Sequence, residues 1–194
     1  MTTEKPTPRR VLGIVGSPRP GGNTDLLVDE VLNAAANEGA SVEKVHLSKL
    51  TIAPCTACEG CKTKGHCIVD DDLGQVLDRM NDSDIWVLGT PVYFWGPTAW
   101  LKAFIDRWYG SRQYVDFASK RAIVVVPLED NKDATARHTV GMLKDTLEYT
   151  KTELVATIVA KGVNKKGEVN DHPDYLEAAR RAGQLAVTTL SGAG

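Results

Sequence analysis

Apolar residues along the chain follow two spacings, one typical of buried strands and one typical of amphipathic helices. Short runs at residues 10–16, 85–90 and 121–127 are almost wholly apolar, as expected for strands covered on both faces. Between such runs, segments such as "TDLLVDEVLNAAANEG" place apolar residues three or four positions apart, which indicates helices. This alternation predicts an α/β fold, a parallel sheet with helices on both faces.

The pattern predicts five strands and five helices without an internal repeat or a linker, hence one domain over residues 1–194. Polar tails are expected at 1–8 and 191–194. Gly39 should end the first helix, Asp71 or Asp72 should cap the second, and Pro97 should occupy the first position of the third. The strands are expected over 10–16, 41–47, 85–90, 121–127 and 153–160, and the helices over 24–39, 71–84, 97–110, 133–149 and 173–190.

Charge and hydropathy exclude several classes of partner. Acidic and basic residues number 25 and 23, giving a net charge of −2, whereas nucleic acid or an anionic membrane would favour a basic face. The longest apolar runs are far shorter than the ~20 residues that span a bilayer. The polar start "MTTEKPTPRR" has no signal-peptide pattern. We therefore expect a cytoplasmic protein that binds neither nucleic acid nor membrane and whose thiols are reduced.

The loop after the first strand, "GSPRPGGNTDLL", combines two adjacent glycines with polar side chains at the start of a helix. Sheets of this class bind ligands beyond the carboxyl ends of their strands, and a helix N-terminus favours an anion. The loop lacks the Walker A and G-x-G-x-x-G patterns, so a monophosphate suits it better than a pyrophosphate. The alternative is an ordinary glycine-rich turn with an Asn or Thr cap. The candidate phosphate ligands are Ser17, Arg19, Asn23 and Thr24.

The loop after the 85–90 strand, "GTPVYFWGPTAW", is rich in aromatic residues. Such a surface at the ligand-binding edge of the sheet would stack against a flat heteroaromatic group. The alternative is that these side chains belong to the core or to a dimer interface. We prefer that alternative for Trp100, Phe104 and Trp108, which recur at helical spacing. The candidate ring-binding residues are Pro91, Val92, Tyr93, Phe94 and Trp95.

All four cysteines of the chain lie in one loop insertion, residues 54–70, as C-x2-C-x2-C-x5-C. Four thiolates with two-residue gaps are the ligand set of a [4Fe–4S] cluster. Structural zinc more often uses two separated C-x2-C pairs, although His66 could complete a Cys3His site. Reduced thiols without iron and a disulfide are further alternatives. The candidate cluster ligands are Cys55, Cys58, Cys61 and Cys67.

Three segments together resemble a known family: "GSPRPGGNT", the cysteine loop leading into "DDD", and "GTPVYFWGPTAWLKAFIDR". They resemble the flavodoxin-like NADPH-dependent FMN reductases, and among these the iron–sulfur flavoproteins. The resemblance implies a doubly wound five-stranded parallel sheet, bound FMN, a homodimer or homotetramer, and reduction by NAD(P)H or by a protein donor such as ferredoxin. The third loop, "PLEDNKDAT", departs from the glycine-rich stretch of relatives, so no flavin contact is assigned to Leu128 or Glu129.

The expected function is therefore an FMN-dependent oxidoreductase that passes electrons from NAD(P)H or ferredoxin to a small acceptor. Quinones, nitro or azo compounds, free flavin and oxygen all suit an open flavin face. The flavin carries the chemistry, so no catalytic side chain is assigned, and His46, His138 and His172 are interpreted as structural. Two alternatives stay open: a flavodoxin-type electron carrier, and a thiol-based sensor or interaction module without iron.

Overall fold

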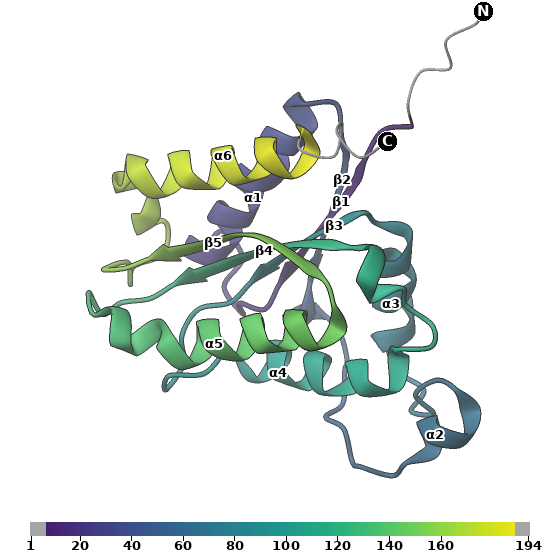
Figure 1. The fold of residues 1–194 in the computed structure, drawn as a ribbon. Helices are drawn as coiled ribbons and strands as arrows, with labels where there is room; N and C mark the ends of the chain where they lie inside the picture. Colours follow the sequence, from purple (N-terminus) through teal and green to yellow (C-terminus); the bar gives the residue numbers. More distant parts are fainter. Residues whose placement is uncertain (1–6, 189–194) are drawn as a thin grey trace, which may run out of the picture.

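The computed structural model describes residues 7–188, whose central element is a five-stranded parallel sheet (Figure 1). The strand order is β2-β1-β3-β4-β5, the flavodoxin-like order of a doubly wound fold. The predicted fold class is thus confirmed. The strands are β1 (Arg10–Val15), β2 (Ser41–His46), β3 (Ile85–Gly89), β4 (Arg121–Pro127) and β5 (Glu153–Ala160).

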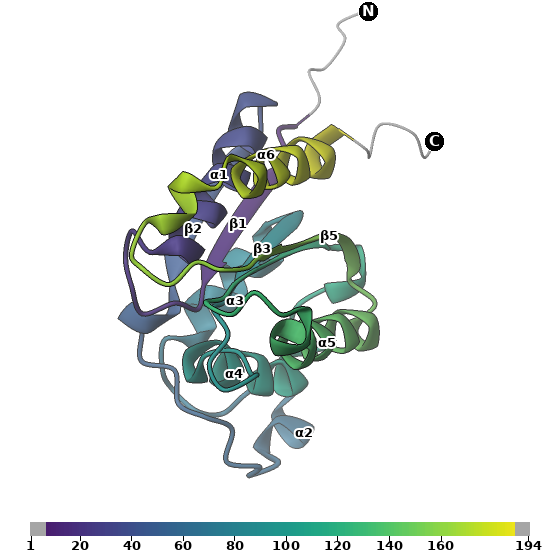
Figure 2. The ribbon, with the colours of Figure 1, turned by 90° about the vertical axis from the view of Figure 1, so that its left-hand side faces the viewer.

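Helices cover both faces of the sheet, because successive residues of its central strands point to opposite sides. Leu12 and Ile14 of β1 join one apolar core, whereas Val11 and Val15 join the other. Helices α1 (Asn23–Asn37) and α6 (Pro173–Thr188) lie on one face (Figures 1 and 2). The opposite face carries α3 (Leu73–Asp82), α4 (Ala99–Asp106) and α5 (Asp133–Thr150), while the short α2 (Gly60–Lys64) belongs to the cysteine loop, residues 54–70.

Close approach of α1 to its neighbours depends on two glycines. A Cβ at Gly89 of β3 would lie 2.6 Å from Val28 Cγ2, and a Cβ at Gly183 of α6 would lie 2.3 Å from the Val31 oxygen. Any side chain there would push α1 outward. The two glycines thus fix the position of α1, whose N-terminus borders the ligand-binding edge of the sheet.

The third helix begins later than predicted. Pro97 precedes α4, which starts at Ala99, and Thr98 is its N-cap: the hydroxyl oxygen of Thr98 accepts the Leu101 N–H at 3.3 Å. A threonine hydroxyl at the N-cap accepts a backbone N–H of the first helical turn that would otherwise have no partner. Proline has no side-chain acceptor and cannot do this. The same hydroxyl donates to the Gly16 oxygen at 2.6 Å, so α4 is anchored to the end of β1.

The other helix boundaries agree closely with the predictions. Gly39 adopts a left-handed φ of 87° just after α1, and α3 starts after Asp72, with its Leu73 N–H bound to Asp71 Oδ1 at 3.1 Å. Phe104 and Trp108 are core residues, as preferred, whereas Trp100 is 40% exposed. The proposed tails lie mostly outside the described residues. None of the helices between residues 7 and 188 is long and apolar enough to cross a membrane.

Candidate functional site

A cavity of about 450 Å³ opens at the carboxyl edge of the sheet and brings together most of the predicted ligand residues. The glycine loop, residues 16–24, and the aromatic loop, residues 91–96, both line it, although 67 residues of sequence or more separate them. Trp95 lines a neighbouring cavity instead, which shares Val92 and Phe94 with the first. The predicted residues on the first cavity are Ser17, Arg19, Asn23, Thr24, Pro91, Val92, Tyr93 and Phe94.

The glycine loop turns sharply before α1. The Gly22 N–H donates to the Arg19 oxygen at 2.9 Å, which closes a turn with Pro20 and Gly21 at its centre. Proline has a negative φ and Gly21 has a φ of 67°, which is the type II combination. Ser17 and Thr24 are buried on either side of this turn. The turn thus directs the first backbone N–H groups of α1, which have no intrahelical partners, toward an anion.

A buried carboxylate, which the sequence analysis did not single out, holds this turn in place. Asp25 Oδ2 accepts the Gly21 N–H at 2.7 Å, and Asp25 Oδ1 lies 2.7 Å from Lys44 Nζ. Burial alone would raise the pKa of Asp25, but hydrogen bonds from Lys44 and Gly21 outweigh it and lower that pKa. The same Lys44 ammonium contacts Asp29 at 2.6 Å. Asp25 is therefore ionised at neutral pH and fixes the glycine loop.

Two predicted phosphate ligands connect the glycine loop to the segment after β5. Arg19 Nη1 donates to the Asn164 oxygen at 3.3 Å, and Asn23 Nδ2 donates to the Lys165 oxygen at 3.0 Å. Asn23 Oδ1 also accepts the Val169 N–H at 3.1 Å. Both polar atoms of the Asn23 side chain thus have a partner, while one Nδ2–H remains as a further donor.

The aromatic loop forms a strained two-residue turn. Tyr93 and Gly96 exchange backbone hydrogen bonds of 2.8 and 3.0 Å, and the two residues between them have left-handed φ values, 47° for Phe94 and 63° for Trp95. Such a turn normally carries Asn or Gly. Phe94 is 96% exposed and Trp95 52%. Backbone strain of this kind is concentrated at functional sites. Here it presents the Phe94 ring to the first cavity and the Trp95 ring to the neighbouring one.

Two further segments that the sequence analysis left unassigned complete the cavity wall. Leu128 and Glu129 line it from the end of β4, as do Asn164 and Lys166 from the segment after β5. Leu128 and Glu129 come directly after a buried parallel strand, and this position indicates a place on the ligand-binding edge of the sheet. No motif in the local sequence indicates that Asn164 or Lys166 lines the cavity.

All four cysteines line a second cavity, of about 490 Å³, together with Arg107 and Gly110. Each is a free thiol; Cys55 and Cys58 are exposed, whereas Cys61 and Cys67 are half-buried. A Cβ at Gly110 would lie 3.0 Å from Cys61 Cβ, so only glycine lets this thiol approach closely. Within residues 7–188, no three His, Cys, Asp or Glu side chains are close enough to share one metal ion. The loop therefore gathers the four thiols around one space without bringing them into ligating distance.

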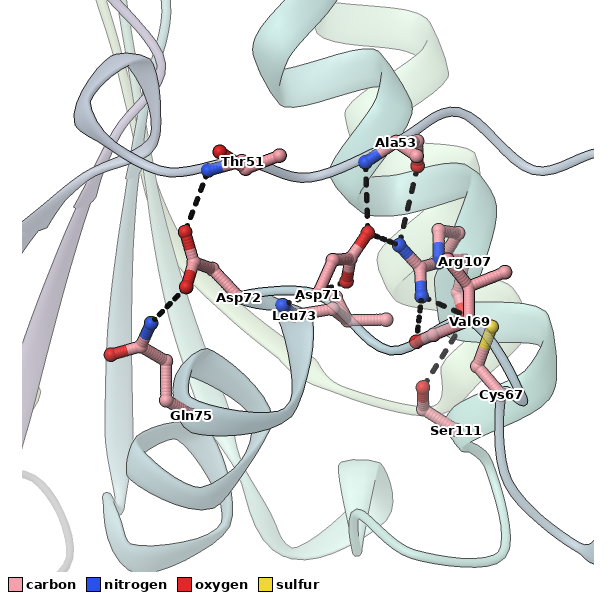
Figure 3. Close-up of polar contacts among 10 residues, drawn as sticks. All are labelled: Thr51, Ala53, Cys67, Val69, Asp71, Asp72, Leu73, Gln75, Arg107 and Ser111. Carbon is pink, nitrogen blue, oxygen red and sulfur yellow. Dashed lines mark hydrogen bonds and ion pairs between the residues drawn. The ribbon is translucent and has the colours of Figure 1, made fainter.

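Arg107, at the end of α4, ties the cysteine loop to the helical layer (Figure 3). Its side chain is only 1% exposed. Nη1 contacts Asp71 Oδ2 and donates to the Ala53 oxygen at 3.3 Å, while Nη2 donates to Cys67 Sγ and to the Val69 oxygen, both at 3.2 Å. The guanidinium thus reaches both ends of the loop and one of its thiols.

This ion pair keeps both charges at neutral pH. Burial would raise the pKa of Asp71, but hydrogen bonds from Arg107 and from the Ala53 and Leu73 N–H groups lower it. Conversely, burial would lower the pKa of Arg107, and Asp71 and Cys67 raise it. Arg107 Nε is buried without a hydrogen-bond partner among residues 7–188. Four thiols around one cavity and a buried cation that donates to Cys67 fit an anionic group with thiolate ligands, such as an iron–sulfur cluster.

Comparison with known proteins agrees with this geometry. The family model for NADPH-dependent FMN reductase matches residues 9–164. An iron–sulfur flavoprotein of Methanocaldococcus jannaschii is 48% identical over 98 residues, which are 50% of this chain and 51% of that relative. The chain thus spans about half the length of such curated relatives. A putative NAD(P)H-dependent FMN-containing oxidoreductase of Bacillus subtilis is 26% identical over 179 residues, 89% of this chain and 95% of its own.

Solved structures share the fold at low sequence identity. An NAD(P)H:quinone oxidoreductase from Methanothermobacter marburgensis superposes with a TM-score of 0.73 at 17% identity, covering 92% of this chain and 97% of its own. The Trp repressor binding protein from Bacillus subtilis gives 0.67 at 23% identity, covering 90% and 98%. The flavodoxin-like fold and the resemblance seen in the sequence are both confirmed, and the chain belongs to the NADPH-dependent FMN reductase family.

Proposed function

We propose that the protein is an FMN-dependent NAD(P)H oxidoreductase that passes electrons to a small acceptor. The observation that carries this proposal is the 450 Å³ cavity, which joins an anion-binding turn to an aromatic rim at the ligand-binding edge of the sheet. Bound FMN would supply redox chemistry, taking a hydride from NAD(P)H and passing its two electrons and its proton on to the acceptor. The membership of the chain in the FMN reductase family supports this assignment.

The residues of the cavity would bind and orient the cofactor. The buried hydroxyls of Ser17 and Thr24 and the backbone N–H groups at the start of α1 would hold the phosphate. The aromatic loop would cover the flavin ring. Its Val92 N–H donates to the Pro127 oxygen at 3.3 Å, and Thr139 Oγ1 donates to the Trp95 oxygen at 2.9 Å, so the strained turn is supported from two sides. The ring would therefore meet a preformed surface.

We further propose that Cys55, Cys58, Cys61 and Cys67 hold a [4Fe–4S] cluster. The cluster would supply one-electron transfer, which suits a donor such as ferredoxin. The shared cavity, the Arg107 contact and the relatives named iron–sulfur flavoprotein support this assignment. The thiols do not lie within ligating distance of one metal ion in residues 7–188, so the loop would have to rearrange to hold the group, which the exposure of Cys55 and Cys58 permits.

The exposed surface around the 450 Å³ cavity supports a proposal of self-association. Phe94, Trp95 and Trp100 are exposed apolar residues on or next to the aromatic loop, and apolar patches of this kind mark interaction sites. Trp108, also considered for the interface, is buried and does not contribute. We propose a homodimer or homotetramer in which a second subunit covers the aromatic loop.

The test is anaerobic purification followed by spectroscopy and cofactor analysis. We expect a flavin spectrum, released cofactor that chromatographs as FMN, four irons with acid-labile sulfide per chain, and rapid bleaching of the flavin by NADPH. Bleaching only with reduced ferredoxin would instead identify an electron carrier. A protein that binds no flavin, with or without added FMN, would overturn the proposal and favour the thiol-based sensor.

A further inference from the structure

Lys166 lies over the glycine loop, although 144 residues separate it from Gly22 in sequence. A Cβ built on Gly21 would be 3.2 Å from Lys166 Cε and 3.6 Å from its Nζ. Lys166 also lines the same cavity as Ser17 and Thr24. Its ammonium group therefore borders the turn where an anion would bind.

The segment that carries Lys166 is held firmly against the glycine loop. Arg19 and Asn23 donate to the backbone oxygens of Asn164 and Lys165, as described above. On the other side, Glu168 Oε2 accepts the N–H groups of the same two residues at 2.6 and 2.8 Å. These contacts fix the backbone on the N-terminal side of Lys166, so the start of its side chain is placed next to the glycine loop before a ligand arrives.

The local charges leave Lys166 available for an anion. Asp25 and Asp29 bring two negative charges close to the glycine loop, and Lys44 contacts both of them. Arg19 lines the same cavity, but its guanidinium is held on one side by the bond from Nη1 to the Asn164 oxygen. Among residues 7–188, the Lys166 ammonium has no ion-pair partner. A dianionic ligand at this turn would meet the excess negative charge of Asp25 and Asp29, and Lys166 is a second cation, beside Arg19, that is placed to offset it.

We propose that Lys166 recognises the phosphate of a flavin monophosphate and makes the cavity select FMN over riboflavin. This inference rests on the proposed function, since it assigns a residue to the same cavity. The ammonium would add a charge-assisted contact on the open side of the turn, opposite the backbone N–H groups of α1. Riboflavin has no phosphate, so its affinity should not depend on Lys166.

The experiment titrates the flavin-free full chain with FMN and, separately, with riboflavin, following the quenching of flavin fluorescence. Lys166→Ala should weaken FMN binding about tenfold, which corresponds to about 1.4 kcal/mol, and should leave riboflavin binding unchanged. The loss should shrink at about 1 M salt, where the screening length falls to ~3 Å. Thermal melts should be unaltered, because the side chain is exposed and makes no hydrogen bond within residues 7–188.

Lys165→Ala is the matched control. It removes the same charge from the adjacent position, yet Lys165 does not line the cavity. Its contacts with Asn23 and Glu168 are made by its backbone, so the substitution keeps them. The inference is supported if only Lys166→Ala loses affinity for FMN. It is overturned if the two variants lose equally, or if Lys166→Ala weakens riboflavin as much as FMN. Wild-type protein that binds neither flavin would instead refute the proposed function itself.

Discussion

Arg107 Nη2 lies 3.2 Å from Cys67 Sγ, although α4 and the cysteine loop are separate elements 40 residues apart. The same guanidinium contacts Asp71 and the backbone on both sides of the loop. Lysine keeps the charge but cannot reach these partners at once. Arg107→Lys should therefore lower the free energy of unfolding by about 2–3 kcal/mol, the size of one hydrogen bond to a charged group, and should lower iron content. Urea unfolding and iron assay measure both effects.

Arg112→Lys is the control for this substitution. Arg112 lies five residues further on, where its guanidinium covers the exposed Tyr109 ring at 4.3 Å from the centroid. Its replacement should change the unfolding free energy little. Equal effects of the two variants would show that the Arg107 contacts do not secure the loop.

Cys67→Ser should remove the proposed cluster and spare the flavin. A serine oxygen is a poor ligand for iron in a cube that needs soft donors. The flavin cavity shares no residue with the cysteine cavity, so FMN content and bleaching by NADPH should persist. Iron, acid-labile sulfide and flavin are measured on anaerobic preparations. Loss of flavin together with iron would contradict the independence of the two sites.

Gly110→Ala should disturb the cysteine site through packing alone. The added methyl group would lie 3.0 Å from Cys61 Cβ and 3.4 Å from its sulfur, and overpacking of this kind costs about 1–3 kcal/mol. We expect lower iron content and a lower unfolding midpoint. Gly141→Ala in α5 is the control, because nothing lies within 4 Å of its added carbon; it should stabilise the helix slightly. An unchanged iron content in Gly110→Ala would mean that Cys61 does not need this approach.

The sequence predicts the fold well because each strand is a local property. The run "RAIVVVP" can only be buried on both faces, and seven consecutive buried residues of β4 confirm it. The candidate cysteines and the two loops are also visible in the sequence, since each is a compact motif, and each group lines a cavity. The contacts that the sequence does not reveal join residues that are far apart along the chain. Asp25 with Lys44, Asn164 with Arg19, and Arg107 with Cys67 meet only after the sheet has formed.

His46 should make stability depend on pH in the weakly acidic range. Its ring is half-buried, which lowers its pKa despite the nearby Asp25 carboxylate, and its buried Nδ1 is without a partner among residues 7–188. Below about pH 6.5, the usual value for histidine, the unfolded chain therefore binds a proton more readily than the folded chain, and stability falls as pH falls through the lowered pKa. His46→Gln should remove this part of the pH dependence.

Urea unfolding between pH 5 and 7.5, followed on three proteins, provides the measurement. The control is His138→Gln, since His138 is exposed on α5, and this variant should retain the wild-type slope. A slope that is the same in all three proteins would exclude His46 as its source.

Phe94→Asn should weaken self-association. The substitution removes the most exposed apolar ring of the aromatic loop and places a residue that tolerates a left-handed φ, so the chain itself should gain about 1 kcal/mol by relief of strain. Light scattering at micromolar concentration should show a smaller particle than wild type. The control Leu185→Asn alters an exposed apolar residue on α6, on the other face of the sheet, and should leave the mass unchanged. A wild-type monomer would refute the prediction.

The cysteine loop enters and leaves the domain at a single point. Asp71 Oδ2 accepts the Ala53 N–H at 2.9 Å, and Asp72 Oδ2 accepts the Thr51 N–H at 2.7 Å, so the flanking backbones run side by side (Figure 3). Changing the length of a segment whose ends already meet costs little entropy. This stretch can therefore be lengthened, shortened or replaced together with its four cysteines while the flavodoxin-like scaffold stays intact.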